Sequence, residues 1–527
     1  MSYKFALNTL ARHWPLSGQT PNNAGGFGYD ISPWERLDRF LILGSEGGTY
    51  YVGERPLTVM NAQAVQSCLD EDGARVIRRI VEISTQGRAP KVQPVLFALA
   101  MAAAAHNEAT RREALAVLPQ VARTGTHVLL FADYINRLRG WGRGLRRGMA
   151  HWFSGMALDR LTLQAVKYRQ RDGWSLRDVL RLAHPVTDER DRQALFRWLT
   201  HPDDPEAIAA ARGALPMIQG LYRVREAQDA EEVADLIVRY SLPREAIPTE
   251  WLNHVAVWDA LLVDMPMTAM IRNLGKMTAV GLLSETSDAG RYVARRLGDV
   301  EQLAAARIHP IQVLLALKTY RGGNGLRGGL SWDPVPDLVD ALDQAYEQSF
   351  RFVTPTGKKL LIALDVSASM EWWTCGGSPL TALEAAAAVA QVFVRTEPSV
   401  KVIGVDTSVH KAIEKARAEP LDRFVSACAA IGGGGTDLSL PFTWAAKRKE
   451  RFDAILTLTD NETWAGRQHP VQALVRYRNK VNAEARAVLL ATTSTRTSVI
   501  PKTDPLSFGV AGFDAAVPLL VGDFLRG

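Results

Sequence analysis

The sequence predicts a long array of packed α-helices followed by a smaller α/β domain with a doubly wound, mostly parallel sheet. In residues 1–350, apolar side chains recur every three or four positions between short Pro and Gly breaks, and continuous β-type runs are scarce. In residues 351–527, short aliphatic runs alternate with helix-like segments, as in a parallel sheet. The 527 residues suffice for two to four domains of about 100–200 residues each.

The first part has the apolar spacing of amphipathic helices. Alanine-rich stretches at 99–105 and 304–306 would let neighbouring helices approach closely, as in stacked helical pairs. No strict sequence period is present, so the array is an interpretation at the level of the fold. The apolar positions that support it include Val76, Ile77, Ile80, Val81, Ile83, Val179, Leu180, Leu182, Ala183, Ile311, Leu314 and Leu315.

The second part contains four predicted strands, and two of them end in aspartate. The strands cover 359–365, 399–405, 452–460 and 485–490, with an alanine-rich helix predicted over 381–393. In doubly wound sheets, ligands bind beyond the carboxyl ends of the strands. Asp365 and Asp460 occupy such ends, so a ligand site is expected there.

Composition excludes several classes of protein. Apolar residues make up 47% of the chain and charged residues 22%, as in globular proteins. The three cysteines form no CxxC pair, which argues against a disulfide framework and a cysteine zinc site. The N-terminus lacks an apolar signal segment, and the longest apolar runs fall short of the ~20 residues that cross a membrane. A soluble, cytoplasmic protein without a membrane partner is therefore expected.

Positive charge is concentrated in one region. The net charge of +6 is mild for this length, but residues 101–200 hold 17 basic and 9 acidic residues, a balance of +8, and residues 201–250 hold 5 and 10, a balance of −5. Within 137–147 there are five arginines around Trp141, and such a patch can neutralise phosphates and stack on bases. The alternative is a solvated helical face. The arginines are Arg137, Arg139, Arg143, Arg146 and Arg147.

A second basic segment follows at 167–174. If this segment is helical, Lys167 and Arg171 share one face and Arg169 points elsewhere. His184 lies one predicted helix further on, where an ordinary capping role is the alternative. His309 is expected to have a structural role. Gly144 and Gly148 each weaken a helix over 143–150 by about 1 kcal/mol relative to alanine, so the directions of Arg146 and Arg147 are not fixed by the sequence.

Oxygen donors in three segments of the second part predict a metal site. Asp365, Ser367 and Ser369 follow a strand at spacings of two and four, Thr436 follows the glycines at 432–435, and Asp460 ends another strand. A hard cation such as Mg²⁺ takes such oxygen ligands. The alternative is that Asp365 and Ser367 only cap the next helix. Because no activated nucleophile or general base accompanies the five residues, binding rather than catalysis is expected.

These three segments together resemble the metal-ion-dependent adhesion site of the von Willebrand factor A family. The resemblance covers about 170 residues. It implies that Asp365, Ser367, Ser369, Thr436 and Asp460 hold a divalent cation, Mg²⁺ being expected, directly or through water. An open coordination position would then accept a carboxylate of a partner.

The first part resembles the TROVE domain of the Ro 60 kDa autoantigen family and its bacterial relatives. The matching stretches are NNAGG at 22–26, RFLILGSE at 39–46, GTYY at 48–51, GWGR at 140–143, the segment 167–174, MPMTAMIRNLGKM at 265–277, RIHP at 307–310 and YRGGNG at 320–325. A TROVE-like part followed by an A-type domain is the arrangement of that family. The fold implied is a ring of HEAT-like helical repeats, made by one chain and so monomeric, joined to a von Willebrand factor A domain.

The resemblance also implies a function. Family members are non-catalytic: they bind small noncoding Y RNAs on the outer face of the ring and pass single-stranded 3′ ends of misfolded or immature RNAs into the hole. Lys167, Arg171 and His184 match the family's RNA-contact positions, and Arg169 shares their segment. RNA rather than DNA is the expected partner, with an exoribonuclease in RNA quality control. Two alternatives remain: an adhesion or chaperone-like module without RNA function, and a metal-dependent enzyme acting on RNA.

Overall fold

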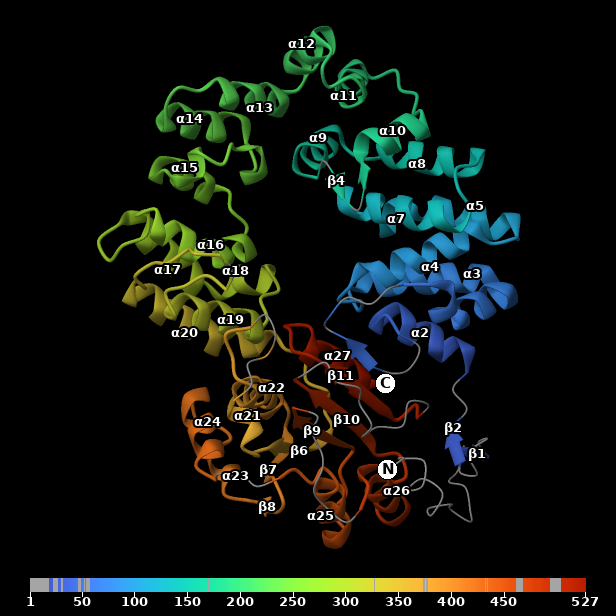
Figure 1. Ribbon diagram of the computed structural model, residues 1–527, viewed down its shortest axis with the longest axis vertical. Coiled ribbons are helices and arrows are strands. Elements are labelled where there is room, and N and C mark those ends of the chain that lie inside the picture. The colour runs from blue at the N-terminus through green and yellow to red at the C-terminus, as the bar shows by residue number, and fades with distance from the viewer. Residues whose placement is uncertain are drawn as a thin grey trace.

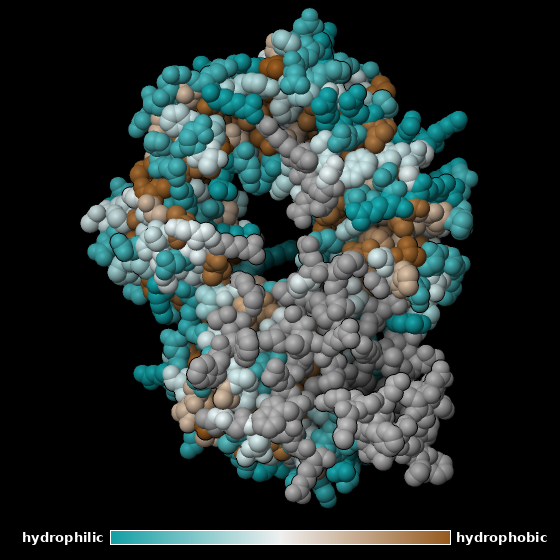
Figure 2. Space-filling model, viewed as in Figure 1, coloured by the Kyte–Doolittle hydropathy of each residue, from teal (hydrophilic) through white to brown (hydrophobic). Residues whose placement is uncertain are grey.

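The computed structural model describes residues 19–21, 27–29, 32–45, 49–51, 53, 57–168, 170–171, 173–326, 328–372, 375, 378–431, 433, 435–460, 468–492 and 504–527. Helices of the first part follow one another around an arc, and the α/β domain lies between the two ends of that arc (Figure 1). The space-filling view shows an opening near the centre of the molecule (Figure 2). The prediction of a helical ring followed by an α/β domain is confirmed.

The first half of the arc contains nine helices among the described residues. Each contacts its neighbours in the chain or the next pair, as α3 does with α4 and α5 with α8. Their bounds are α2 Pro33–Leu43, α3 Gln63–Gln86, α4 Val92–Ala104, α5 Glu108–Ala116, α6 Leu118–Val121, α7 Gly125–Leu138, α8 Arg143–Gly155, α9 Leu158–Lys167 and α10 Leu176–Ala183.

The second half continues the same packing and leads to the α/β domain. Two short 3₁₀ turns, η3 (Arg244–Ala246) and η4 (Trp251–Asn253), lie in the connection between α14 and α15. The helices are α11 Arg190–Thr200, α12 Pro205–Ala214, α13 Pro216–Glu226, α14 Ala230–Tyr240, α15 Val255–Val263, α16 Met267–Ala279, α17 Asp288–Gly298, α18 Val300–Ala305, α19 Pro310–Arg321 and α20 Pro336–Ser349.

The apolar spacing read from the sequence identifies the buried faces of these helices. Val76, Ile77, Ile80 and Ile83 of α3 are buried, whereas Val81 is half-buried. Helix α4 is apolar on all sides because α2, α3, α5 and α7 pack around it. No helix among the described residues is both long and apolar enough to span a bilayer.

Helix α8 is continuous despite the two glycines that made its helicity uncertain. A Cβ atom on Gly148 would lie 3.0 Å from Leu115 Cβ and 3.1 Å from its Cδ2. The glycine therefore lets α8 approach α5 closely, and the packing of Leu145, Met149 and Trp152 offsets the low helix propensity.

The helical interpretation of residues 167–171 is wrong. Helix α9 ends at Lys167, and the chain forms a short hairpin in which β4 (Gln170–Arg171) pairs antiparallel with β5 (Trp174–Ser175). Gly173 adopts a φ of +79°, a conformation that glycine reaches at little cost and that turns the chain back. Lys167 and Arg171 therefore do not share a helical face.

The α/β domain is built on a seven-stranded sheet with the order β3-β11-β10-β9-β6-β7-β8. All neighbouring strands are parallel except β7 and β8. The four predicted strands are confirmed, with small shifts at their ends. The strands are β3 Thr49–Tyr51, β6 Lys359–Asp365, β7 Ser399–Val405, β8 Val409–His410, β9 Ala454–Thr459, β10 Arg486–Ala491 and β11 Ser507–Ala511.

Helices cover the sheet, and the predicted alanine-rich helix is α22. Thr381 caps it in a capping box with Glu384. Outside the sheet, β1 (Gln19–Pro21) pairs antiparallel with β2 (Phe27–Tyr29). The helices are α21 Ser369–Trp372, α22 Ala382–Thr396, α23 Ile413–Ala416, α24 Leu421–Ala429, α25 Leu440–Arg448, α26 Pro470–Lys480 and α27 Val517–Arg526.

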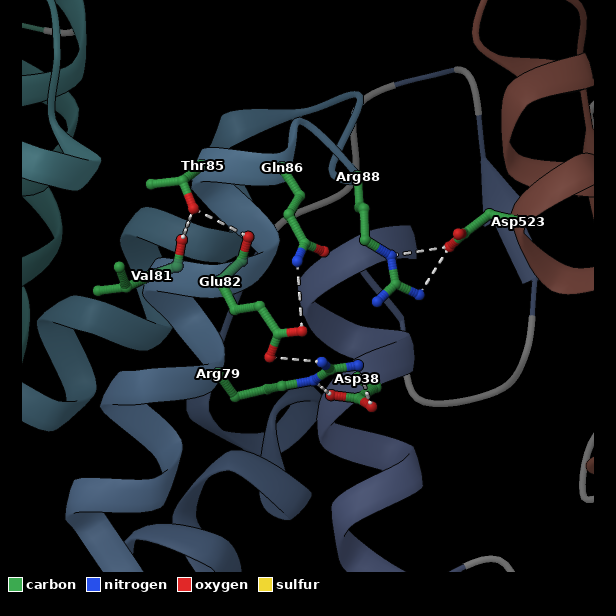
Figure 3. A network of polar contacts seen from close by, with 8 residues as sticks. All are labelled: Asp38, Arg79, Val81, Glu82, Thr85, Gln86, Arg88 and Asp523. Carbon is green, nitrogen blue, oxygen red and sulfur yellow. Dashed lines mark hydrogen bonds and ion pairs between the residues drawn. The ribbon is translucent and has the colours of Figure 1, made fainter. Parts of the chain in front are cut away.

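Contacts at both ends of the helical arc hold it to the α/β domain. At one end, Lys318 Nζ of α19 lies 2.9 Å from Glu384 Oε1 of α22 and 3.3 Å from Asp422 Oδ1 of α24. At the other end, β3 adds a parallel edge strand to β11, and Arg88 Nη2 lies 2.8 Å from Asp523 Oδ2 of α27 (Figure 3). Residues remote in sequence thus complete one sheet.

Candidate functional site

The predicted metal ligands lie where the strand order of the sheet reverses. β6 is central, with β7 on one side and β9 on the other, so the chain crosses from one half of the sheet to the other between them. Asp365 is the last residue of β6, and Asp460 directly follows β9. In open α/β sheets, ligands bind at such a switch point because the connections leave in opposite directions.

Hydrogen bonds shape the Asp365-Val366-Ser367-Ala368-Ser369 turn. The Ser367 backbone N–H donates to Asp365 Oδ1 at 2.9 Å, and the Thr459 hydroxyl of β9 donates to Asp365 Oδ2 at 2.6 Å. Ser367 Oγ lies 3.2 Å from Ser369 Oγ. The carboxylate is fully buried, so both of its oxygens are held in place away from solvent.

A close backbone approach brings the Thr436 segment toward the same turn. A Cβ atom on Gly433 would lie 2.3 Å from the Ala368 nitrogen and 2.5 Å from Ser367 Cα, so only glycine allows this approach. Thr436 and Asp460 are both buried. Four of the five predicted ligands are therefore buried, and Ser369 is half-buried.

The electrostatics of this group suit a cation. Burial raises the pKa of Asp365 to about 6, hydrogen bonds from Ser367 and Thr459 oppose the rise, and the Asp460 carboxylate adds to it. None of the five largest influences on the pKa of Asp365 comes from a basic side chain. Two nearby buried carboxylates with hydroxyls beside them form an all-oxygen donor set, which fits a hard divalent cation.

Sequence reasoning missed Asp406, which lies at the same edge of the sheet as Asp365 and Asp460. Asp406 directly follows β7, the same strand-end position that identified Asp365 and Asp460. Its Oδ1 accepts a hydrogen bond from the Ser408 N–H at 2.7 Å and lies 2.8 Å from His410 Nε2. Its carbonyl oxygen accepts the Asp437 N–H at 2.9 Å, which fixes the residue after Thr436. Asp406 thus positions the Thr436 segment.

The predicted RNA-binding arginines lie on an exposed surface. Helix α8 turns Leu145, Gly148 and Met149 inward. Arg137 of α7 forms an ion pair with Asp133, with Nη2 and Oδ2 2.8 Å apart. The other four predicted arginines make no ion pair with a described residue. The five exposed arginines are Arg137, Arg139, Arg143, Arg146 and Arg147.

A tryptophan contact joins the two basic segments. Trp141, between α7 and α8, lies with its ring centroid 5.8 Å from that of Trp174 in β5. Helix α7 contacts both strands of the β4–β5 hairpin, and α10 contacts α7, α8 and β5. Arg171 is in β4, whereas Arg169 lies outside the described residues. The elements that carry the predicted contacts therefore form one packed group.

The two remaining predicted contacts lie at the ends of helices in this group. Lys167 Nζ is 3.6 Å from Glu245 Oε1 of η3 and 5.7 Å from the centroid of the Tyr168 ring. His184 is exposed at the C-terminus of α10, with a φ of 47°, and its N–H donates to the Leu180 carbonyl at 3.0 Å. Lys167 thus connects this group to η3.

A pocket that the sequence did not reveal lies beyond η3. Its volume is about 620 Å³, and α16, α19, the 325–332 segment and Ala515 of the α/β domain line it. Arg244 of η3, next to the Glu245 that contacts Lys167, also lines it. Arg272, Lys276 and Trp332 add positive charge and an aromatic surface. In the sequence, the only feature that pointed to these pocket residues is the TROVE-like motif at 265–277, which contains Arg272 and Lys276.

Comparisons with known proteins agree with the architecture of a helical part followed by an α/β domain. The TROVE domain family matches residues 20–321, and the Ro60 vWA domain family matches residues 359–525. A Deinococcus radiodurans protein named RNA-binding protein RO60 is 38% identical over 512 residues, which cover 97% of this chain and 96% of that protein. A Caenorhabditis elegans protein of the same name is 32% identical over 587 residues, covering 97% and 90%.

A solved structure extends the agreement to three dimensions. The crystal structure of the Deinococcus radiodurans RO (RSR) protein superposes with a TM-score of 0.86 at 37% identity, covering 94% of this chain and 100% of that chain. The relatives are named for RNA binding rather than for catalysis, as the sequence predicts. The chain therefore belongs to the Ro60 family, with a TROVE domain followed by a Ro60 vWA domain.

Proposed function

We propose that the protein binds RNA: small noncoding Y RNA on the outer face of the ring, and single-stranded 3′ ends of misfolded or immature RNAs at the central opening. It would act as a monomeric ring in cytoplasmic RNA quality control and deliver RNA to an exoribonuclease. The observation that carries the proposal is the meeting of the two basic segments at Trp141 and Trp174. The names of the relatives support RNA as the ligand.

Charge and exposure make this surface suitable for phosphates. Arg143, Arg146 and Arg147 project from α8 without an acidic partner among the described residues. Unpaired arginines bind phosphates without first losing an ion pair, and each phosphate contact releases a counterion. The acidic neighbour Glu245 holds Lys167 at one edge of the group, so a phosphate there would compete with a carboxylate.

The pocket beyond η3 supports the second part of the proposal. Lys276 Nζ donates to Asn253 Oδ1 at 2.7 Å, which leaves the ammonium group two further donors. Trp332 stacks on Tyr320 with 6.0 Å between ring centroids and 20° between ring planes, which makes a rigid aromatic surface. Cations beside an aromatic surface bind single-stranded nucleic acid by phosphate contact and base stacking.

The test is the salt dependence of RNA binding. Lys167→Ala with Arg171→Ala removes two phosphate contacts, so the slope of log K against log salt should fall by about 1.4–1.8, at 0.7–0.9 per contact. Fluorescence anisotropy with a labelled structured RNA measures this slope. Arg295→Ala with Lys447→Ala removes the same charge from exposed positions on α17 and α25 and should leave the slope unchanged.

The bound RNA itself decides between the alternatives. RNA captured with the tagged protein from its own cell and sequenced should contain a Y-like RNA and 3′ ends of structured RNAs. Recovery of neither, or an unchanged salt slope in the double variant, would refute the proposal. Capture of proteins alone, lost with Asp365→Ala, would support the adhesion module instead.

We also infer that the turn after Asp365 and the residues beside it hold a divalent cation, Mg²⁺ being expected. Asp365, Ser367, Ser369, Thr436 and Asp460 would hold it. When bound, the cation would offer a coordination position to a carboxylate of a partner. Calorimetric titration with Mg²⁺ should give saturable binding that Asp365→Ala removes, whereas Glu371→Gln, an exposed acid on α21, should bind normally. Equal binding by both variants would exclude this site.

A further inference from the structure

A second pocket lies at the junction between the first helices and the end of the α/β domain. Its volume is about 360 Å³, within the range of about 300–1,000 Å³ typical of small-molecule sites. Helices α2 and α3 form one side, and β10, β11 and α27 form the other. The pocket is therefore made by both parts of the chain, and nothing in the RNA surface described above includes it.

Four arginines line this pocket, and two of them are already neutralised. Arg79 binds both oxygens of Asp38, at 2.6 and 2.8 Å, and also Glu82 at 2.8 Å (Figure 3). Arg88 donates twice to Asp523 Oδ2, at 3.0 and 2.8 Å. These pairs leave Arg79 and Arg88 little capacity for a further anion.

The other two arginines make no ion pair with a described residue, although carboxylates act on both at longer range: Asp504 and Glu35 on Arg39, and Glu484 on Arg486. Arg39 Nη2 donates to the Asp504 carbonyl oxygen at 3.1 Å, while its Nη1 is buried and has no hydrogen-bond partner among the described residues. Arg486 places its guanidinium 5.1 Å from the Phe524 ring centroid and makes no ion pair with a described residue. One cation comes from α2 and the other from β10, so an anion between them would contact both parts of the chain.

The directions of their pKa shifts agree with these contacts. Burial lowers the pKa of Arg39 and of Arg486, whereas the carboxylate of Asp38 raises the pKa of Arg79. Among the described arginines with a resolved pKa shift, only Arg39 and Arg486 are shifted downward. A half-buried cation without an ion-pair partner is less favourable than a solvated one, and an anionic ligand between the two arginines would offset this.

The rest of the lining is apolar on one side and acidic at one edge. Ile42, Leu43, Leu520 and Phe524 supply a hydrophobic wall. Glu35 also lines the pocket; its Oε2 accepts the Ser32 N–H at 2.9 Å in the N-terminal cap of α2, which leaves Oε1 to accept a hydrogen bond from a ring N–H or amino group. Guanidinium groups bind phosphate through paired N–H donors, and an apolar wall suits a flat ring.

We propose that this junction pocket binds a nucleoside monophosphate, with the phosphate held by Arg39 and Arg486 and the base against the apolar wall. The nucleotide is either free or the 5′-phosphorylated terminal residue of an RNA, since both offer a phosphate monoester and a base. Binding would join the first helices to the α/β domain. The proposal does not depend on Y RNA binding, because Lys167 and Arg171 lie on other elements.

Calorimetric titration of the full-length protein with uridine 5′-monophosphate tests the proposal. Saturable binding is expected, and Arg39→Gln and Arg486→Gln should each weaken it about tenfold or more, since each removes a charge-assisted contact. Arg36→Gln, an exposed arginine on the same helix α2, is the matched control and should bind as the wild type does. Uridine and inorganic phosphate should each bind more weakly than the nucleotide.

The outcomes separate the site from its alternatives. No saturable binding, equal weakening by Arg36→Gln, or inorganic phosphate binding as tightly as the nucleotide would each overturn the proposal. Thermal unfolding followed by circular dichroism checks that the variants fold. If Arg39→Gln does not fold, Arg486→Gln alone tests the proposal. Titration with a short 5′-phosphorylated oligouridylate distinguishes the two sources. Binding that requires both arginines would identify RNA ends as the source, and binding that both variants leave unchanged would identify free nucleotides.

Discussion

The buried imidazole of His309 should make the protein sensitive to mild acid. His309 is the N-cap of α19, where Nδ1 accepts the Ile311 N–H at 3.2 Å and Nε2 is buried without a hydrogen-bond partner among the described residues. The residue is 7% exposed, and burial lowers its pKa to about 4. In the unfolded chain a histidine has a pKa of about 6.5.

The sign and size of the effect follow from these two values. The pKa of His309 is lower in the folded state than in the unfolded chain, so its protonation does not affect the free energy of unfolding above about pH 6.5. As the pH drops from about 6.5 to 4, the unfolded chain binds a proton that the folded state does not bind, and the free energy of unfolding falls. At pH 5, which is about 1.5 pH units below the unfolded-state pKa of about 6.5, the imidazole is protonated in the unfolded chain and almost entirely neutral in the folded state. At about 1.36 kcal/mol per unit, the loss is about 2 kcal/mol.

Urea unfolding at pH 7.5 and pH 5 measures this loss. His309→Asn keeps a side-chain acceptor at the N-cap but cannot take up the proton. Between the two pH values its free energy of unfolding should fall by about 2 kcal/mol less than that of the wild type. His184→Asn, at an exposed position, should follow the wild type. If His309→Asn loses as much stability as the wild type, the imidazole is not buried in its neutral form.

Two further predictions concern packing and a buried ion pair. Gly148→Val should destabilise the protein by about 1–3 kcal/mol, because its side chain would overlap Leu115, whereas Gly144→Ala should stabilise it by up to about 1 kcal/mol, since its Cβ would meet Leu115 Cδ1 at 3.7 Å. Urea unfolding of both variants checks this, and equal effects would contradict it. Arg478→Met should cost about 3–5 kcal/mol by leaving Asp504, 2.6 Å away and 4% exposed, as a buried unpaired charge. Thermal melting would show it, and a melting temperature equal to that of the wild type would contradict it.

The sequence predicts those elements whose signal is local. The strand at 359–365 is confirmed residue for residue as β6, because an uninterrupted aliphatic run is buried on both faces of a parallel sheet. The position of Asp365 and Asp460 follows from the same rule, since parallel strands end at one edge. Asp406 has the same position at the end of β7, and Thr407 and Ser408 follow it, so the sequence carries the same kind of signal there.

Elements that depend on distant contacts were not predictable. β3 is three residues long, and it is a strand only because β11, more than 450 residues later, offers an unpaired edge. The hairpin after Lys167 is packed against α7, and the contact between Trp141 and Trp174 that joins the basic segments spans two helices. Periodicity within a window cannot reveal such contacts, because the free energy that selects them comes from tertiary packing.

The two candidate ligand sites of the α/β domain lie at opposite ends of its strands. Arg486 is the first residue of β10 and is paired in register with Ala454, the first residue of β9. Asp460 follows the last residue of β9, six positions further along. At about 3.3 Å per residue, their backbones are separated by about 20 Å along the strands. Charges that far apart, with Debye screening of about 8 Å in physiological salt, act almost independently. Asp365→Ala should therefore leave nucleotide binding unchanged, and Arg486→Gln should leave Mg²⁺ binding unchanged, so each site can fail its test without the other.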